Sequence, residues 1–411
     1  MDLHHTAVHG RHRRRRARRP LLAGLTVALL AVLAVVAVLW QREAGSPVDH
    51  EGHEPLPAAR GGAEPSPEPS PEPSPEPAPA PASASAPAPA AAPGPGTAAA
   101  RPAPAASAAS PGTGPALAVG AAPHHVAVAP DGRYGYVADP AAGAVVRVDT
   151  ASGEVTATIP IPAGPPKMVT FSPDGSRAHV SAYTEDYGAN AVVTLDTATD
   201  TVTGTVEVGR GPYAAATSPD GRFLYLPYYD EDHLDVLDTA SGAVVARIPV
   251  APCPHWVAVT PDGRYAYTTN HFSDVVTLLD LETNTVATTI PVGDGPHSLE
   301  LSPDGTRVAV VDYIGGDLEF IDTATNTVVA TVPDVGDGPQ DVTYAPDGRH
   351  VYTANVDDGT VSVMDVASGA VTARIPAGDS PTSVAVTPDG RRALVTVFEG
   401  GTVLVLDTAA A

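Results

Sequence analysis

PHSLELSPDGTRVAVVDYIGGDLEFIDTATNTVVATVPDVG is the sequence of residues 296–336. It contains four short apolar runs, SLELS, RVAVV, DLEFID and TVVATVP, and turn-forming residues separate them. In the SPDG turn, proline presets φ, aspartate favours the next position, and glycine adopts the left-handed conformation that closes a hairpin. The stretch therefore predicts a meander of four short β-strands.

The same unit recurs along the chain. The tripeptide Pro-Asp-Gly begins at seven positions that lie 42 to 46 residues apart, namely Pro130, Pro173, Pro219, Pro261, Pro303, Pro346 and Pro388. Four strands at a period in the low forties are typical of a β-propeller blade. We therefore predict an all-β, seven-bladed β-propeller with four-stranded blades over residues 116–411.

The seventh unit lacks its fourth strand, because only Thr408 and three alanines follow Asp407. Residues 116–120, with the sequence ALAVG, resemble a fourth strand that precedes the first Pro-Asp-Gly. We predict that this N-terminal strand completes the last blade by pairing with residues 402–407, which removes unpaired sheet edges.

An aspartate ends the third strand of every unit. An aspartate side chain can accept hydrogen bonds from the amides of its own turn, so we expect a structural role at these positions. The seven residues are Asp149, Asp196, Asp238, Asp280, Asp322, Asp365 and Asp407.

The N-terminal residues have the pattern of a membrane anchor. Residues 11–19 contain seven arginines, and residues 21–40 carry no charge. Twenty helical residues span about 30 Å, the thickness of the hydrocarbon core. We predict a basic cytoplasmic segment over residues 1–20 and a transmembrane helix, a signal anchor, over 21–40, with the remaining chain outside the cell. Cleavage after the apolar run is the alternative and would give a secreted form.

Residues 41–115 are rich in proline, alanine, serine and glutamate, with the core sequence PEPSPEPSPEPSPEPAPAPA. Proline at every second position prevents helix and sheet hydrogen bonding and favours an extended polyproline II chain. We predict a disordered linker that holds the propeller away from the membrane at the cell surface.

The charge and cysteine content exclude other classes of protein. The net charge is −24, so nucleic acid is not expected as a main partner, since binding to phosphates needs a basic surface. Cys253 is the single cysteine, which excludes an intramolecular disulfide and a cysteine-rich zinc module.

Two runs carry a family resemblance. The sequences YAYTTN at residues 265–270 and HVYTAN at residues 350–355, each preceded by Pro-Asp-Gly, resemble the YVTN repeat of YncE-like surface propellers. The resemblance implies the propeller fold over residues 116–411 and leaves the activity open. Proteins of this kind include surface-layer propellers, lactonases and the heme domain of a nitrite reductase.

Large polar and aromatic side chains gather at one predicted rim of the channel. One group follows the proline that opens each innermost strand and includes His124, Lys167, Tyr213, His255, His297 and Gln340. A second group lies in the loops between second and third strands and includes Tyr183, Tyr228, Asn270, His271, Asp312, Tyr313 and Asn355. Packing does not require such a ring, so we predict a ligand-binding funnel; the alternative is a hydrated mouth with incidental side chains.

Three of these residues raise the possibility of a divalent metal. His255 and His297 belong to neighbouring blades, and His271 is the third member of the tightest group that the sequence predicts. Lys167 is the only lysine in the chain. We therefore also expect a polar or anionic small ligand or partner group at this rim, and an anion should bind more strongly as the pH falls from 8 to 6, because unperturbed histidines gain charge below about pH 6.5.

These observations predict a membrane-anchored binding or interaction scaffold without enzymatic activity, with a monomeric propeller and a small molecule, a polymer or a protein as its ligand. The alternative is a lactonase- or lyase-like propeller enzyme that uses the rim histidines, with or without a metal. No nucleophile elbow and no c-type heme motif occurs in the sequence, so no catalytic residue is indicated.

Overall fold

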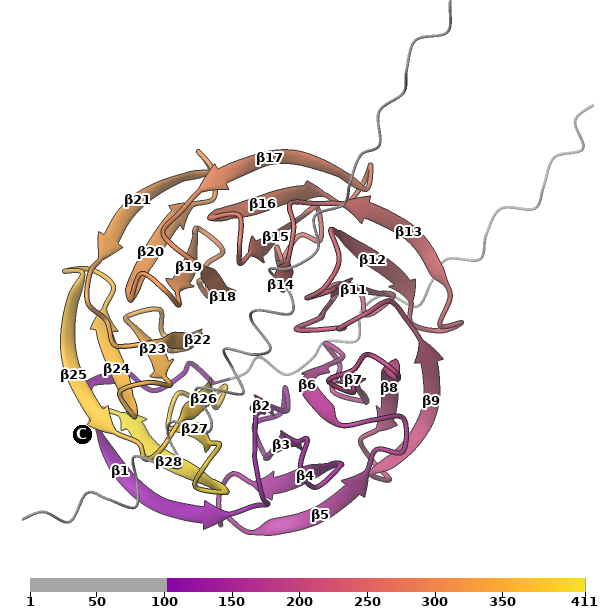
Figure 1. Ribbon diagram of the computed structural model, residues 1–411. Coiled ribbons are helices and arrows are strands. Elements are labelled where there is room, and N and C mark those ends of the chain that lie inside the picture. Colours follow the sequence, from indigo (N-terminus) through magenta and orange to yellow (C-terminus); the bar gives the residue numbers. More distant parts are fainter. Residues whose placement is uncertain (1–101, 411) are drawn as a thin grey trace, which may run out of the picture. The chain divides into compact units, whose positions relative to one another are not determined.

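The computed structural model describes residues 102–410. These residues form seven four-stranded antiparallel sheets arranged as blades in a ring around a central axis (Figure 1). The predicted seven-bladed propeller is confirmed. The predicted anchor over residues 21–40 lies outside the described residues. Among residues 102–410, no helix is long and apolar enough to cross a membrane.

Each blade is a meander that runs from the channel to the outside of the ring. The strands of blades 1 to 4, innermost first, are β2 (His125–Val128), β3 (Tyr134–Asp139), β4 (Ala144–Asp149) and β5 (Val155–Pro160); β6 (Pro166–Phe171), β7 (Arg177–Tyr183), β8 (Asn190–Asp196) and β9 (Thr201–Glu207); β10 (Ala216–Thr217), β11 (Phe223–Pro227), β12 (His233–Asp238) and β13 (Val244–Pro249); β14 (Pro254–Val259), β15 (Tyr265–Asn270), β16 (Val275–Asp280) and β17 (Thr285–Pro291).

The remaining three blades continue the pattern, and the last one combines the two ends of the described chain. Their strands are β18 (Pro296–Leu301), β19 (Arg307–Asp312), β20 (Asp317–Asp322) and β21 (Thr327–Val332); β22 (Pro339–Tyr344), β23 (His350–Asn355), β24 (Thr360–Asp365) and β25 (Ala370–Pro376); β26 (Pro381–Val386), β27 (Arg392–Val397), β28 (Thr402–Ala409) and β1 (Ser107–Ala118).

The hydrophobic core lies between neighbouring blades. Second strands such as β3 are buried along their whole length, whereas outermost strands such as β17 are mostly exposed. Tyr136 of blade 1 stacks on Phe171 of blade 2, with ring centroids 5.1 Å apart. Because both faces of the inner strands pack against other blades, these strands consist of small and branched apolar residues and do not alternate with polar ones.

The turns hold the expected geometry. In blade 5, Asp304 accepts a hydrogen bond from the amide of Thr306 at 3.0 Å, and Gly305 has a φ of 69°. At the end of the third strand, Asp322 accepts hydrogen bonds from the amides of Ala324 and Thr325 at 3.1 and 2.8 Å. The predicted structural role of this recurrent aspartate is confirmed in blades 1 to 6.

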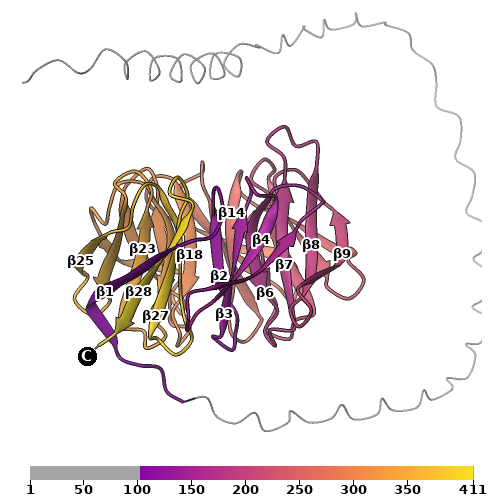
Figure 2. The same cartoon turned by 90° about the horizontal axis from the view of Figure 1, so that it is seen from below.

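The ring closes as predicted. β1 pairs antiparallel with β28, with Leu117 opposite Val403 (Figure 2). The strand begins at Ser107, within the stretch that composition assigned to the linker over residues 41–115. Pro111 and Pro115 are tolerated because β1 is an outermost strand with one edge unpaired.

Candidate functional site

The innermost strands all start at the same end of the channel, which we call the mouth. Pro296 at the start of β18 lies opposite Asp312 at the end of β19, and Pro254 is likewise opposite Asn270. Both groups of rim residues that the sequence predicts are therefore placed at one end of the propeller. The Pro-Asp-Gly turns lie at the other end.

Six rings from blades 3, 4 and 5 form one group, the mouth cluster, which consists of Tyr213, Tyr229, His255, His271, His297 and Tyr313. His255 is at its centre, with ring-centroid distances of 4.8 Å to both His271 and His297 and 4.7 Å to Tyr229. The predicted group of three histidines is thus brought together.

A close approach of two blades builds this cluster. The alanines at 214–216 let the inner chain of blade 3 approach blade 4, so that Ala214 donates to the carbonyl of His255 at 3.2 Å and accepts from the amide of Val257 at 3.3 Å. The regular inner strand of blade 3 is reduced to β10. As a result, the ring of Tyr213 lies 5.1 Å from that of His255.

Cys253 is held in a strained position beside the cluster. Its φ is 62°, a left-handed conformation that side chains other than glycine rarely adopt. The buried Sγ atom lies 3.8 Å from Nδ1 of His255. Burial raises the pKa of the Cys253 thiol to about 12, so this residue is a neutral thiol and not a thiolate ligand.

The mouth histidines are uncharged. Nδ1 of His297 lies 2.7 Å from the carbonyl oxygen of Gln340, and burial lowers the pKa of His297 to about 3. Burial and the two neighbouring imidazoles lower the pKa of His255 well below its usual value. The neutral rings of His255 and His297 therefore donate from Nδ1 to a carbonyl and keep Nε2 as an acceptor. The expected gain of charge near pH 6.5 is wrong, because burial opposes protonation.

Lys167 does not provide a free positive charge. Its Nζ lies 2.5 Å from Oε1 of Glu185 and 4.9 Å from the ring centroid of Tyr183. The carbonyl of Lys167 lies 3.2 Å from Nδ1 of His124, whose pKa burial lowers to about 4. The electrostatic basis expected for an anionic ligand is therefore missing at this rim.

Four predicted rim residues are fully buried and cannot contact a ligand at the mouth. Asn270 donates to the carbonyl of Ala251 and accepts from Oγ1 of Thr277, both at 2.7 Å. Tyr228 donates to Asp235 at 2.9 Å. These polar side chains tie strands and loops together within a blade. The four residues are Tyr228, Asn270, Asp312 and Asn355.

The three-histidine metal site is not formed. Among residues 102–410, no group of three or more His, Cys, Asp or Glu side chains has an arrangement that could hold a metal ion. The rings of His271 and His297 are perpendicular, with centroids 5.6 Å apart, and Nδ1 of His297 is engaged with a backbone carbonyl. Proximity of the rings does not bring three donor atoms to a common point.

Sequence reasoning missed two contributors to the site, Trp256 and Ile314, and placed a third, Phe272, in a rim loop. The ring of Trp256 lies 6.5 Å from His297 and 5.6 Å from His125, and it lines a channel cavity of about 450 Å³ that no mouth-cluster residue lines. Phe272 and Ile314, next to His271 and Tyr313 in the mouth loops, are 67% and 57% exposed. The rarity of tryptophan in this chain was a signal for Trp256, whereas exposure cannot be read from sequence.

The channel cavity is separate from the mouth and polar at its wall. Asp341 accepts hydrogen bonds from Ser298 at 3.0 Å and from Ser383 at 2.7 Å, and so links blades 5, 6 and 7. Burial raises the pKa of Asp341 to about 6 and that of Glu300, which also lines the cavity, to about 7. Trp256 lines this cavity and also lies 6.5 Å from the rings of Tyr213 and His297 in the mouth cluster, while the ligand-binding funnel stays a prediction.

Comparison with known proteins supports the fold. Residues 230–343 and 339–410 match the family described as the cytochrome D1 heme domain. The structure is similar to Kuenenia stuttgartiensis hydrazine synthase, with 21% identity and a TM-score of 0.64 over 71% of this chain and 97% of that chain. No curated protein matches the sequence. The chain is therefore a β-propeller, and its membership of the YVTN-repeat, YncE-like group stays a prediction from the repeat motifs.

Proposed function

We propose that this propeller is a binding scaffold without enzymatic activity, and that it contacts its partner through the mouth of the channel on blades 3 to 5. The observation that carries the proposal is the mouth cluster together with the exposed Phe272 and Ile314. Exposed apolar side chains beside aromatic rings are typical of interaction sites.

The chemistry of the mouth defines the partner. The neutral imidazoles of His255 and His297 keep Nε2 as an acceptor, and Tyr313 carries a hydroxyl group. Residues 116–411 contain 38 acidic and 13 basic residues, a formal charge of 13 − 38 = −25. Such a field repels acidic partners. The site therefore fits a neutral or basic surface with hydrogen-bond donors and an apolar group.

The scaffold is favoured over the lactonase- or lyase-like enzyme. A general base works best with a pKa near the operating pH, whereas burial keeps the pKa of His297 at about 3. Within residues 102–410, none of the three mouth histidines forms an ion pair with a carboxylate. Binding requires neither feature.

Photocrosslinking tests the mouth as the contact surface. With benzoyl-phenylalanine at Phe272 of the full-length chain, irradiation of expressing cells is expected to yield a discrete adduct on gel electrophoresis. The matched control is Val245 on the outer strand β13, which is 54% exposed and far from the mouth end of the inner strands. Equal labelling from both positions, or none from Phe272, would contradict the proposal.

A tetrapyrrole is the second candidate, favoured by the match of residues 230–410 to a heme-domain family. His297 would hold the iron of such a group, because its Nδ1 proton is bound by the carbonyl of Gln340 and Nε2 is left as the donor atom. Ferric heme added to the full-length chain distinguishes the candidates. A Soret band that shifts with the wild type and not with His297→Ala would support the tetrapyrrole and weigh against the scaffold.

We also propose that residues 21–40 anchor the chain with the propeller outside the cell. The support is the arginine-rich segment before an uncharged run of twenty residues. Protease added to intact cells is expected to remove the propeller and leave a small membrane fragment on an immunoblot. Full protection would contradict the topology, and a free chain with a new N-terminus in the medium would show cleavage instead.

A further inference from the structure

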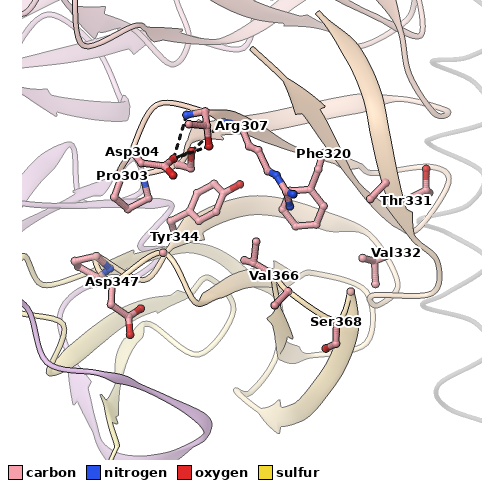
Figure 3. Close-up of a pocket in the computed structure, with 17 residues that line it drawn as sticks. Pro303, Asp304, Arg307, Phe320, Thr331, Val332, Tyr344, Asp347, Val366 and Ser368 are labelled. Carbon is pink, nitrogen blue, oxygen red and sulfur yellow. Dashed lines mark hydrogen bonds between the residues drawn. The ribbon is translucent and has the colours of Figure 1, made fainter. Parts of the chain in front are cut away.

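Crevices recur between neighbouring blades at the Pro-Asp-Gly end of the propeller. We name them by their blades: crevice 5–6 (Figure 3), crevice 7–1 and crevice 2–3, with volumes of about 670, 490 and 300 Å³. Each is lined by the Pro-Asp-Gly turns of both blades and by the turn after the third strand of the second blade. The three crevices are therefore equivalent positions that can be compared directly.

Crevice 7–1 already holds a proline-containing segment of this chain. Pro102 lines this crevice, and three residues later Ala105 donates a hydrogen bond to the carbonyl of Asp389 in the blade 7 turn at 2.8 Å. The segment reads Pro-Ala-Pro-Ala over residues 102–105 and forms no strand. One crevice of this type thus accommodates an extended proline-rich chain.

An arginine at the start of the second strand behaves differently in crevice 5–6. In crevice 7–1, Arg392 donates to the carbonyls of Thr150 and Ala151, the latter at 2.6 Å. In crevice 2–3, Arg177 donates to the carbonyl of Thr239 at 3.4 Å.

Arg307 is the equivalent residue of crevice 5–6, and the N–H groups of its guanidinium have no hydrogen-bond acceptor within residues 102–410. Its guanidinium lies 5.9 Å from the ring centroid of Phe320. Crevice 5–6 also has a larger volume than the other two crevices.

A second donor in the same wall also lacks a partner. Tyr344 is 4% exposed, and its buried hydroxyl has no hydrogen-bond partner among residues 102–410. Figure 3 shows the hydroxyl end of Tyr344 directed toward the side of the crevice that Arg307 and Phe320 form. The wall beside them is apolar, with Val332 and Val366.

We propose that crevice 5–6 binds an extended, proline-rich peptide segment of a partner protein. Proline carries a carbonyl acceptor and no N–H donor, so a proline-rich polyproline II chain has more acceptors than donors and needs donors from its receptor. Arg307 and Tyr344 supply N–H and O–H donors that have no hydrogen-bond partner within the described residues of the fold. The apolar wall accommodates proline rings, as in other grooves that bind such peptides.

Charge restricts the segment to a neutral one. Asp304 and Asp347 line the crevice, and the propeller carries a formal charge of −25 from 38 acidic and 13 basic residues. Both aspartates are engaged within the fold, Asp304 with Ser302 at 2.7 Å and Asp347 with Ser107 at 2.8 Å. They repel an acidic peptide and do not compete for Arg307.

Fluorescence anisotropy of labelled acetyl-(Pro-Ala)₄-amide with the full-length chain tests the proposal. We expect saturable binding that Tyr344→Phe weakens about fivefold and Arg307→Met about tenfold, the usual effect of losing a neutral and a charged hydrogen bond. The matched control Arg177→Met should bind as the wild type does, because that arginine is engaged within crevice 2–3.

A benzophenone on the same peptide locates the site. Adducts are expected at Val366 and Ser368 on the rim of crevice 5–6. Equal binding of acetyl-(Gly-Ala)₄-amide, unchanged binding by both variants, or adducts at Arg391 of crevice 7–1 would each overturn the proposal. Thermal unfolding of both variants, compared with the wild type, shows whether a loss of binding reflects a loss of the fold.

Discussion

Replacing Asp312 by asparagine is expected to stabilise the propeller in alkaline solution. Asp312 is fully buried, and neither carboxylate oxygen has a hydrogen-bond partner among residues 102–410. The charged groups that face it are all acidic: Glu319 and Asp317 on β20, and Asp274 and Asp294 in the adjoining loops. Burial, followed by the charge of Glu319, raises the pKa of Asp312 to about 8.

The neighbouring blades show what this position requires. β15, β19 and β23 end in Asn270, Asp312 and Asn355. Asn355 donates to Ser362 at 3.0 Å, and Asn270 accepts from Thr277 at 2.7 Å. In blade 5 the corresponding pair, Asp312 and Glu319, consists of two carboxyl groups, so it must hold a proton where the other blades use an amide.

The sign of the pH effect follows from the raised pKa. Folded Asp312 retains a proton that the unfolded chain releases near pH 4, so its contribution to stability is complete below pH 4 and is lost as the pH rises to about 8. Asparagine does not titrate. The free energy of unfolding of Asp312→Asn should therefore exceed that of the wild type by about 5 kcal/mol at pH 8.5 and by little at pH 4, since each pKa unit of the shift is worth about 1.4 kcal/mol.

Denaturant unfolding of the full-length chain between pH 4 and 9 measures this difference. Subtraction of the two curves removes the contributions of Glu300 and Asp341, which are common to both proteins. Asn270→Asp is the matched reverse change and should destabilise blade 4 increasingly with pH. A difference that does not vary with pH would show that Asp312 is not protonated in the folded state.

The repeat motif predicted most of the fold, because each blade repeats one local pattern of turns and short apolar runs. The start of β1 at Ser107 escaped prediction for a physical reason. An outermost strand needs only one paired edge, so Pro111 and Pro115 can remain within it and make it look like linker. The composition of a segment indicates its backbone preference. It does not indicate whether the segment will form an outermost strand with one unpaired edge.

The sequence predicted which histidines meet at the mouth, but it did not predict their charge. Equal spacing after the opening proline placed His255 and His297 in neighbouring blades, and their rings do meet. The charge of a histidine depends on its burial and on the hydrogen-bond partners of its ring nitrogens. Neither property follows from the spacing of residues in the sequence. Lys167 shows the same limit, since its partner Glu185 lies in a loop eighteen residues further on. Alignment of Asp312 with Asn270 would have revealed the buried acid pair.

Deleting Ser107–Ala118 from the full-length chain is expected to lower the melting temperature by about 10 °C or more. The deletion removes the strand that pairs with β28 from Thr402 to Ala409. It also uncovers the apolar cluster to which Leu117 contributes, and it breaks the hydrogen bonds of Ser107 to Asp347 and His350 in blade 6, at 2.8 and 2.6 Å. A loss of several kcal/mol follows from these contacts, and each kcal/mol shifts the melting temperature of a domain of this size by about 2–4 °C.

The specificity of this effect rests on two comparisons. Removing twelve residues from the linker, the same number that β1 contains, should leave the melting temperature unchanged. A synthetic peptide of residues 105–120 added to the shortened chain should restore most of the lost stability, because β28 then regains its antiparallel partner. Without that peptide, the exposed edge of β28 should promote association of the chain, measurable by light scattering, since an unpaired strand is a template for pairing with another copy. A shortened chain that melts with the wild type would mean that the ring is held closed by the contacts between blades alone.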